Sequence, residues 1–519
     1  MQKRLKILRL VVSSFMLVAI GFLFLDFSDS VPSAWFNAIT WLQFTPSLIK
    51  FMQMLAHGLA VTAYGFAVVL LLTLLFGRVY CSYICPLGIF QDIVSWYSKV
   101  LRSSPKKKFR FRYTNPKSWL RYSILVVFFL SIFTGGIILD LLEPFSNFGR
   151  LVSDLLRPIY VVCNNLLARL FEATGSYVLY PVTIAKTDPF ALIVPGAMLA
   201  LVVGLAAWKG RLYCNTVCPV GTLLGLVSKI SLFRIRFDIE KCNQCGNCMF
   251  ACKSQCIDVK NRKVDFSRCV GCGNCLKLCD RNAIRYAFPP PKEPKLSLPV
   301  DTSKRKFVAG SLLLAVYSVQ ALAQPFQNPK RNKRGKPDAE TADQGTTRKH
   351  AVSPPGSYAY EHFTKSCTAC HLCVSACPTG VLKPAFLEYG FFGTMQPFMD
   401  FRANFCDHEC IKCTEICPNG AILPLTVEEK ITTQIGVARF IKHNCIAFTD
   451  ESACRAWACV ENCPTKAIRL VLYKNGKKLP EIIPDICTGC GACEYVCPAT
   501  PKAFIVDGHL EHKKVRSSV

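Results

Sequence analysis

The chain has 519 residues, of which 51% are hydrophobic and 30 are cysteines, and its formal net charge is 62 − 34 = +28. A mean hydropathy of +0.28 is high for a soluble chain and natural for one with several membrane spans. The cysteines recur at two- and three-residue gaps in a long chain, which argues against the short disulfide scaffolds of secreted domains. Nucleic-acid binding is set aside as well, because much of the basic charge borders apolar segments.

Four apolar stretches are long enough to cross a hydrocarbon core of about 30 Å. They lie at 7–25, 54–76, 120–142 and 190–208. We therefore predict an α-helical membrane domain with four spans over residues 1–230.

The orientation of these spans follows from the distribution of lysine and arginine. Both are dense in the first nine residues and over 99–117, and sparse over 26–53 and 143–189. Since basic loops stay in the cytoplasm, we expect the N-terminus and the loop at 77–119 to be cytoplasmic and the other two loops to face outward.

Three ionisable residues near the outer ends of the spans are candidates for handling a quinol. His57 opens the second apolar stretch, while Asp140 and Glu143 close the third. The alternative for each is an ordinary solvated or snorkelling side chain at a helix end.

A short internal repeat follows the second and fourth spans. Residues 77–88, GRVYCSYICPLG, match residues 210–221, GRLYCNTVCPVG. A duplicated two-helix unit with a pseudo-twofold axis along the membrane normal would bring four cysteines together at the cytoplasmic boundary: Cys81, Cys85, Cys214 and Cys218. Four thiolates can hold a metal or a cluster, so we predict an additional redox centre or metal centre here. The alternative is a helix-end packing motif in which proline and glycine make the turn.

Two ferredoxin-type runs follow and predict a cytoplasmic two-cluster module over 231–300. In two-cluster ferredoxins the fourth cysteine of each run binds the other cluster. One predicted [4Fe–4S] ligand set is Cys242, Cys245, Cys248 and Cys279, and the other is Cys269, Cys272, Cys275 and Cys252. Zinc is the alternative metal. Lys253 and Asp280 stand where a proline usually follows, and Cys256 is an alternative ligand to Cys252.

A shorter apolar stretch at 307–323 follows the basic sequence Ser303-Lys304-Arg305-Lys306 and ends in small residues. This order is that of a signal sequence, and the basic part resembles a twin-arginine signal with Lys304 in place of the first arginine. We predict a fifth span or a signal anchor over 301–324, with a buried helix as the alternative. A polar linker is expected over 325–360.

Four further runs, each ending in Cys-Pro, predict a four-cluster module over 361–519, outside the cytoplasm. The middle two runs have stretched spacing, which an inserted loop allows. Their cysteines are Cys367, Cys370, Cys373 and Cys377; Cys406, Cys410, Cys413 and Cys417; Cys445, Cys454, Cys459 and Cys463; and Cys487, Cys490, Cys493 and Cys497. With the two earlier runs, 6 × 4 = 24 cysteines predict six [4Fe–4S] clusters in α+β ferredoxin-like modules. Cys163 fits no run.

On these motifs, residues 1–290 resemble NapH, the membrane iron–sulfur subunit of the quinol dehydrogenase that serves periplasmic nitrate reductase. Residues 303–505 resemble NapG, its exported four-cluster partner. The resemblance implies a natural fusion in the bacterial inner membrane that takes electrons from the quinol pool, menaquinol above all, to a periplasmic cytochrome or reductase. It also implies that the exported runs share ligands first with fourth and second with third. A cytoplasmic electron donor is a further candidate partner.

Two other functions fit the same features. Related NosR- and CcoG-like membrane polyferredoxins serve nitrous-oxide reductase maturation and cytochrome-oxidase assembly, so a maturation or regulatory donor that reduces a partner's metal centre is the first. A structural scaffold is the second. In each of these functions, electrons that pass between the two sets of clusters must cross a hydrocarbon core of about 30 Å. The four-cysteine site and a bound quinone are the candidate bridges.

Overall fold

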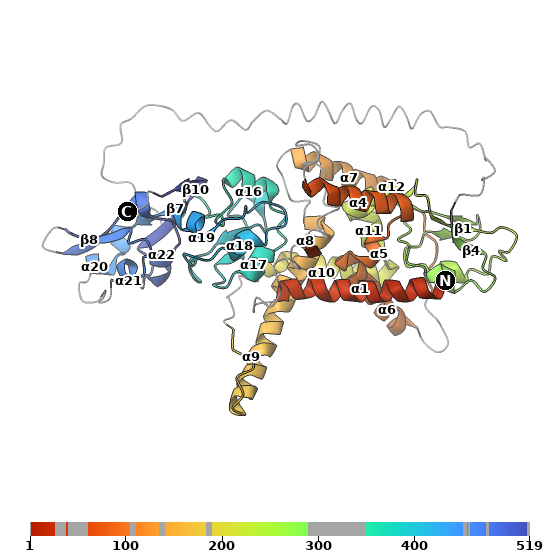
Figure 1. The fold of residues 1–519 in the computed structure, drawn as a ribbon, viewed down its shortest axis with the longest axis horizontal. Helices are drawn as coiled ribbons and strands as arrows, with labels where there is room; N and C mark the ends of the chain where they lie inside the picture. The colour runs from red at the N-terminus through yellow and green to blue at the C-terminus, as the bar shows by residue number, and fades with distance from the viewer. Residues whose placement is uncertain are drawn as a thin grey trace.

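The computed structural model describes residues 2–25, 38–39, 61–103, 110–133, 141–182, 189–288, 348–449, 454, 457–473 and 477–515. His57, Asp140, the stretch at 301–324 and most of the predicted linker lie outside these residues. A helical body occupies the middle of the molecule, with a small module beside its β1–β4 end and a larger module at the opposite end (Figure 1). The two modules therefore face each other across the helices.

Among the described residues, an apolar helix lies at each of the four predicted spans. These helices are α1 (Gln2–Leu25), α4 (Val61–Phe76), α7 (Ser118–Phe133) and α10 (Pro189–Lys209). Of these, α1 and α4 run along the long axis of the molecule (Figure 1). The segments Lys6–Leu25 and Ala191–Lys209 are long and apolar enough to cross a membrane, whereas the described parts of α4 and α7 are shorter. Four spans plus an anchor thus remain a prediction.

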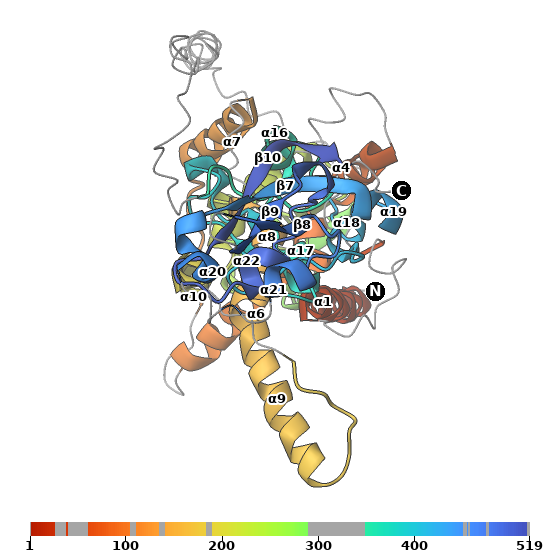
Figure 2. The same cartoon turned by 90° about the vertical axis from the view of Figure 1, so that its left-hand side faces the viewer.

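Of the described residues, a third segment long and apolar enough to cross a membrane, Pro144–Ala173, lies where the sequence pattern predicts only an outward loop. It is built from α8 (Pro144–Arg150), the π-helical turn η2 (Leu151–Leu156) and α9 (Arg157–Ala173). Pro144 starts α8 at a position where the missing N–H costs nothing, and Glu143 caps it by accepting a hydrogen bond from the Ser146 amide at 3.0 Å. The polar residues Ser146, Asn147 and Asp154 interrupt the apolar pattern. Figures 1 and 2 show α9 projecting away from the rest of the helical body.

The two copies of the repeat fold alike. Each begins with a glycine in the left-handed region, Gly77 at φ 75° and Gly210 at φ 71°. A short helix follows, and the second cysteine of the copy then caps a helix that has proline in its first turn. The helices are α5 (Tyr80–Tyr83) and α6 (Pro86–Arg102) in one copy, and α11 (Leu212–Thr216) and α12 (Pro219–Ser228) in the other.

The small module, residues 231–288, is held together by two antiparallel strand pairs. The strand β1 (Arg234–Phe237) pairs with β4 (Ile284–Ala287), and β2 (Ile257–Asp258) pairs with β3 (Lys263–Val264). The single-turn helices α13 (Asn247–Phe250) and α14 (Asn274–Lys277) each follow a left-handed glycine within a cysteine run.

The large module, residues 348–515, contains three antiparallel strand pairs among its described residues. These are β5 (Leu382–Pro384) with β6 (Pro397–Met399), β7 (Thr433–Phe440) with β10 (Phe504–Lys514), and β8 (Ile468–Leu472) with β9 (Lys478–Ile482). Its helices are α16 (Tyr360–Ser366), α17 (Leu372–Ala376), α18 (Lys412–Glu415), α19 (Val427–Thr432), α20 (Ile446–Thr449), α21 (Ala458–Glu461) and α22 (Ala492–Val496), with 3₁₀ turns η3 (Phe391–Gly393), η4 (Lys442–Asn444) and η6 (Pro484–Ile486).

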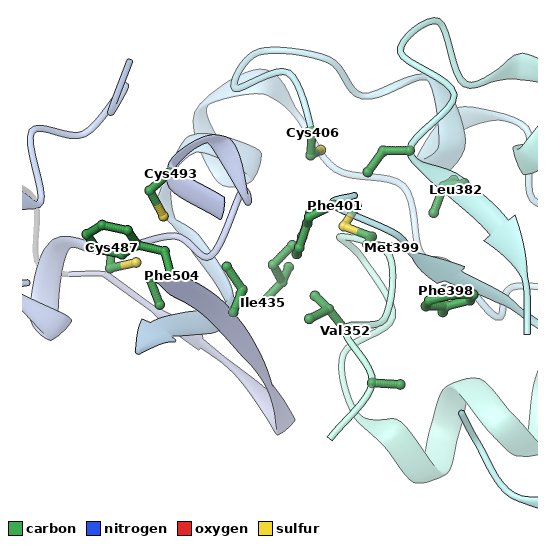
Figure 3. Packing of buried hydrophobic residues seen from close by; sticks show 14 of the residues in the cluster. Val352, Leu382, Phe398, Met399, Phe401, Cys406, Ile435, Cys487, Cys493 and Phe504 are labelled. Atoms are coloured by element: carbon green, nitrogen blue, oxygen red, sulfur yellow. The ribbon is translucent and has the colours of Figure 1, made fainter. Parts of the chain in front are cut away.

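Cysteines form part of the core of the large module. Cys406, Cys487 and Cys493 lie in the same buried cluster as Phe401 and Ile435 (Figure 3). Two-stranded sheets of this length are marginal on their own. The module therefore depends on whatever its cysteines bind.

Candidate iron–sulfur and redox centres

In the small module, the fourth cysteine of the first run lies with the second run. Burial raises the pKa of the Cys275 thiol well above its usual range, and the nearby thiolates of Cys272, Cys269 and Cys252 raise it further. Cys252 of the first run thus lies with the first three cysteines of the second. Buried thiolates that repel one another are stable together when a positively charged metal core binds them, which fits a cluster.

Cys256 is a fifth sulfur at the same place. Its Sγ lies 3.5 Å from the Sγ of Cys252, and it is 1% exposed. A hydrogen bond joins the two thiols, and either sulfur can be its donor. A single cavity is lined by both of them together with Cys269, Cys272 and Cys275. Both sulfurs therefore lie at the same site, where Cys252 stays the predicted ligand and Cys256 the alternative.

In the large module, the first run shares ligands with the second. Burial raises the pKa of the Cys373 thiol, and the thiolates of Cys367, Cys370 and Cys417 raise it further. A second group contains Cys377 of the first run and three cysteines of the second run. The thiolates of its other members raise the pKa of Cys413 in the same way; the group is Cys377, Cys406, Cys410 and Cys413.

The third run shares ligands with the fourth. Burial raises the pKa of Cys459 to about 12, and its neighbouring thiolates are those of Cys454, Cys445 and Cys497. The other group is Cys463, Cys487, Cys490 and Cys493. The expectation of first-with-fourth and second-with-third sharing is wrong. The reason is local packing, since α17 contacts α18 and α21 contacts α22, which places each fourth cysteine beside the neighbouring run.

The donor set suits a cluster better than a single ion. Among the described residues, no three His, Cys, Asp or Glu side chains are close enough to hold one metal ion. A four-iron cluster is larger, so its ligands stand farther apart. Backbone amides of Ala283 and Ala467 donate to the Sγ atoms of Cys279 and Cys463, both at 3.2 Å. Such N–H···S bonds stabilise bound thiolates and tune the potential of a cluster.

The repeat brings its four cysteines into one buried site in the helical body. Cys81, Cys85, Cys214 and Cys218 are each at most 4% exposed and lie close enough to interact electrostatically. The two arginines of the repeat are exchanged between the copies: Arg78 Nη2 donates to the Cys214 carbonyl at 3.0 Å, and Arg211 Nη1 donates to the Cys81 carbonyl at 2.6 Å.

Glycine is required at the end of each copy. A Cβ on Gly88 would lie 2.4 Å from the Cys81 carbonyl oxygen, and a Cβ on Gly221 would lie 2.4 Å from that of Cys214. The structure thus relates the two copies by an approximate twofold exchange.

Positive charge surrounds this site. Asp92 accepts from Arg211 Nε at 2.8 Å and also pairs with Arg9 and with Lys253, the latter at 3.5 Å. Three cations around one carboxylate leave an excess of positive charge. Polar donors also reach the sulfurs, since Gln91 Nε2 lies 3.1 Å from Cys214 Sγ. The site therefore suits an anionic thiolate-bound centre.

One buried core joins the two ferredoxin-like modules through this site. It contains Val270 of the small module, Cys81, Cys85 and Cys218 of the repeat, and Leu372 of the large module, with Cys272 and Cys370 packed at its border.

Direct hydrogen bonds fix the two ends of this core. Arg9 Nη1 donates to the Cys272 carbonyl at 3.1 Å, and Arg150 Nη1 donates to the Ala369 carbonyl at 3.0 Å. Close packing adds to the second contact, because a Cβ on Gly149 would lie within 2.4 Å of the Cys370 carbonyl oxygen. Both modules are therefore docked on the helices.

Of the predicted quinol-side residues, only Glu143 lies in the described part of the chain. Its carboxylate caps α8 and accepts from Ser146 Oγ at 2.5 Å. It also lies near Cys370: burial raises the pKa of that thiol to about 12, and the thiolate of Cys417 and the carboxylate of Glu143 contribute. The contact gives Glu143 a structural role, and its quinol role stays a prediction.

The sequence pattern gives no indication of the residues that join η2 to the large module. His371 Nδ1 lies 2.9 Å from Asp154 Oδ1, and His371 Nε2 lies 2.8 Å from the Met395 carbonyl. Ser375 Oγ donates to Ser153 Oγ at 2.8 Å. The signal available in the sequence is a cluster of polar residues inside an otherwise apolar segment.

Family models match both the repeat and the cysteine runs. A model described as a 4Fe-4S binding domain matches residues 60–110 and 190–240, which hold the two copies of the repeat. Models described as 4Fe-4S dicluster domains match residues 265–381, 366–422 and 452–500. The prediction of ferredoxin-type iron–sulfur domains is confirmed.

Curated ferredoxin-type proteins are similar to part of the chain. "Ferredoxin-type protein NapG" of Escherichia coli (strain K12) is 36% identical over 157 residues, which are 28% of this chain and 65% of NapG. "Methylamine utilization ferredoxin-type protein MauM" of Methylophilus methylotrophus is 34% identical over 161 residues, 30% of this chain and 69% of MauM. "Ferredoxin-type protein NapF" of Escherichia coli (strain K12) is 28% identical over 151 residues, 29% of this chain and 82% of NapF. The chain thus spans just under two thirds of the length of NapG. No solved structure gives a significant match.

Proposed function

Because the chain belongs to the ferredoxin-type [4Fe–4S] proteins that include NapG and MauM, we propose that it carries electrons across a membrane, from a quinol to an acceptor outside the cytoplasm. The relatives support the electron-transfer role itself. The observation that carries the transmembrane route is the single buried core that runs from Cys272 past the four-cysteine site to Cys370.

The proposed route uses six clusters and a further centre at the repeat. When bound, iron–sulfur centres supply one-electron redox chemistry. The chain's own residues hold these centres by thiolates and exclude water with apolar neighbours. At the repeat, Arg78 and Arg211 add positive charge beside the thiolates, which stabilises an anionic centre.

The distance between the points where the two modules contact the helical body can be estimated along α1. Arg9, which binds the Cys272 carbonyl, and Phe24, which packs near Gly149 and the Cys370 carbonyl, are 15 residues apart on one helix. At 1.5 Å per residue that is about 22 Å. A centre in the repeat would divide this distance into two shorter steps.

Electrons would leave through the far end of the large module. The Cys406 amide donates to the Cys490 carbonyl at 3.0 Å, which places the cluster of the Cys406 group beside that of the Cys490 group. The helices α20 and α21, next to the Cys445 group, lie at the end remote from the helical body (Figure 1). We therefore assign the Cys445 group to the exit, where a periplasmic cytochrome or reductase would dock.

The orientation rests on the charge distribution of the sequence. In the proposed orientation, the N-terminus and the small module are cytoplasmic, and the large module faces the periplasm. Menaquinol is the proposed donor, with Glu143, His57 and Asp140 as candidate residues on the outer side. A cytoplasmic donor to the small module is the other entry for electrons.

A Cys85→Ser/Cys218→Ser variant tests the bridging centre. In the purified full-length protein we expect the variant to lose iron and an EPR signal and to slow electron transfer between the two modules after one is reduced. The control is Cys163→Ser, because Cys163 is exposed and belongs to no group. Unchanged iron content, EPR spectrum and transfer rate in the double variant would refute the bridge.

Stoichiometry separates this proposal from a maturation or regulatory role. Continuous oxidation of a menaquinol analogue with a periplasmic acceptor present fits a quinol dehydrogenase. A single reduction of a partner's metal centre for each protein molecule fits a maturation donor instead. Variants that lose cluster ligands yet still support growth would favour a scaffold.

A further inference from the structure

A polar hollow lies where the small module meets the helical body. Its walls come from the loop 114–117, the end of α10, the start of α11 and the small module. The loop is fastened to the small module by Thr114, whose Oγ1 donates to Gln255 Oε1 at 2.9 Å and whose carbonyl accepts from Arg268 Nη1 at 2.8 Å. The hollow is therefore a fixed feature of this junction.

The lining of the hollow is basic. It includes Lys117, Lys209, Arg211 and Arg268 and contains no Asp or Glu. Arg211 is paired with Asp92 and Arg268 with Asp265. Within the described part of the chain, neither Lys117 nor Lys209 pairs with a carboxylate; Lys209 Nζ instead lies 4.5 Å from the centre of the Trp208 ring. Two ammonium groups thus remain available to an anion.

Two buried donors in the lining have no partner among the described residues. They are Nη2 of Arg268 and Oγ of Ser254, whose residues are 4% and 6% exposed. Buried polar atoms are nearly always hydrogen-bonded, so unpaired donors on two lining residues leave room for an acceptor in the hollow. Guanidinium, hydroxyl and ammonium groups together match the oxygen atoms of a phosphate.

We propose that this hollow binds the phosphate headgroup of an anionic phospholipid. The mouth lies at the ends of two apolar helices, because Lys117 directly precedes α7 and Lys209 ends α10. Trp119 and Trp208 beside them are 81% and 57% exposed, which is typical of a membrane interface. Basic pockets between membrane helices on the cytoplasmic side are suited to such headgroups.

The headgroup would stabilise the junction through which the small module meets the repeat. Arg211 lines the hollow and also donates to the Cys81 carbonyl. Ser254 and Gln255 line it and lie between Cys252 and Cys256. A bound phosphate would therefore hold both the four-cysteine site and the nearest cysteine group in place.

The test is retention of phosphatidylglycerol by the purified full-length protein, measured by native mass spectrometry. We expect the wild type to retain it and a Lys117→Gln/Lys209→Gln variant to bind it about twenty-five-fold less, at about five-fold for each lysine near an anionic headgroup. A Ser254→Ala variant, which keeps every charge, should also lose affinity. Unchanged cluster absorbance in both variants would show that they fold.

Two controls distinguish headgroup binding from attraction to general surface charge and from binding of a free anion. A Lys99→Gln/Lys229→Gln variant removes the same charge from α6 and the end of α12, outside the hollow, and should bind like the wild type. Equal loss in this variant would mean that general surface charge binds the lipid and would overturn the proposal. Full retention of the lipid by the Lys117→Gln/Lys209→Gln variant would also overturn the proposal. Displacement of the lipid by inorganic phosphate at equal concentration would overturn it too, because the site would then bind a free anion.

Discussion

Cys272 and Cys370 border the same buried core, although they belong to modules at opposite ends of the helical body. The core between them includes residues of the two copies of the repeat, of the start of the α8–α9 helix and of α1. Close packing from end to end excludes water and holds each group at a fixed distance. The modules are therefore parts of one structure and not separate domains on a flexible chain.

Loss of Arg211 should destabilise the helical body. An Arg211→Gln substitution would remove the two-point partner of the buried Asp92 carboxylate and leave Arg9 and Lys253 to pair with it. The loss should therefore lie below the about 3–5 kcal/mol of a buried charge left without any partner. Thermal unfolding of the detergent-solubilised protein measures the effect. An Asp92→Asn/Arg211→Gln variant removes both charges and should be less destabilised than the sum of the single variants. Additive losses would show that the pair is not coupled.

Cys256 should tune a cluster without being one of its ligands. If Cys252 is the ligand, the Cys256 thiol beside it can donate to its sulfur. With Cys256→Ala we then expect the iron content to stay unchanged and the reduction potential of the Cys269 group to fall, because that donor is lost. Cys252→Ala should instead disrupt that cluster. EPR-monitored redox titration distinguishes the two. Iron loss in Cys256→Ala, with an intact cluster in Cys252→Ala, would show that the ligand roles are reversed.

The sequence predicts the cysteine groups of the small module because their spacing is local. Cysteines two or three residues apart meet on one turn, and the exchange of Cys252 and Cys279 follows from the two-cluster pattern. The spacing alone does not determine which runs exchange in the large module. That choice depends on contacts such as α17 with α18, which join segments about 40 residues apart.

The sequence pattern also fails where polar residues serve a long-range contact. Asp154 lowers the apolar character of its segment, so the pattern predicts a loop, yet its partner His371 is 217 residues away. The sequence pattern does not predict the ion pairs of the buried Asp92 either, because its partners Arg9, Arg211 and Lys253 come from three different parts of the chain. Pair contacts of this kind leave no periodic signal.

Ligand sharing in the large module can be tested by combining substitutions. Cys417→Ser and Cys370→Ser should affect the same cluster, so the double variant should lose no more iron than either single variant. Cys417→Ser with Cys410→Ser should affect two clusters and lose about twice as much. Iron analysis of the purified protein gives the answer. Loss of two clusters in both double variants would instead favour sharing of the first run with the fourth.

Acid should destabilise the large module through His512. Burial, followed by the charge of His509, lowers the pKa of His512 from its usual 6.5 to about 4, and its Nε2 lies 2.9 Å from Ser353 Oγ. Because the unfolded chain binds this proton more readily, the folded state is favoured by neutral His512 above pH 6.5. This stability is lost as the pH falls from about 6.5 to about 4, by about 3 kcal/mol in total.

A His512→Gln variant should remove this pH dependence, because glutamine stays neutral throughout the range. Denaturation of the full-length protein at a series of pH values, followed by cluster absorbance, measures the difference from wild type. His350→Gln is the matched control, since His350 is exposed and its substitution should leave the wild-type slope unchanged. Carboxylates elsewhere titrate in both proteins and cancel in the comparison. Equal slopes for wild type and His512→Gln would show that His512 does not bind its proton differently in the folded and unfolded states.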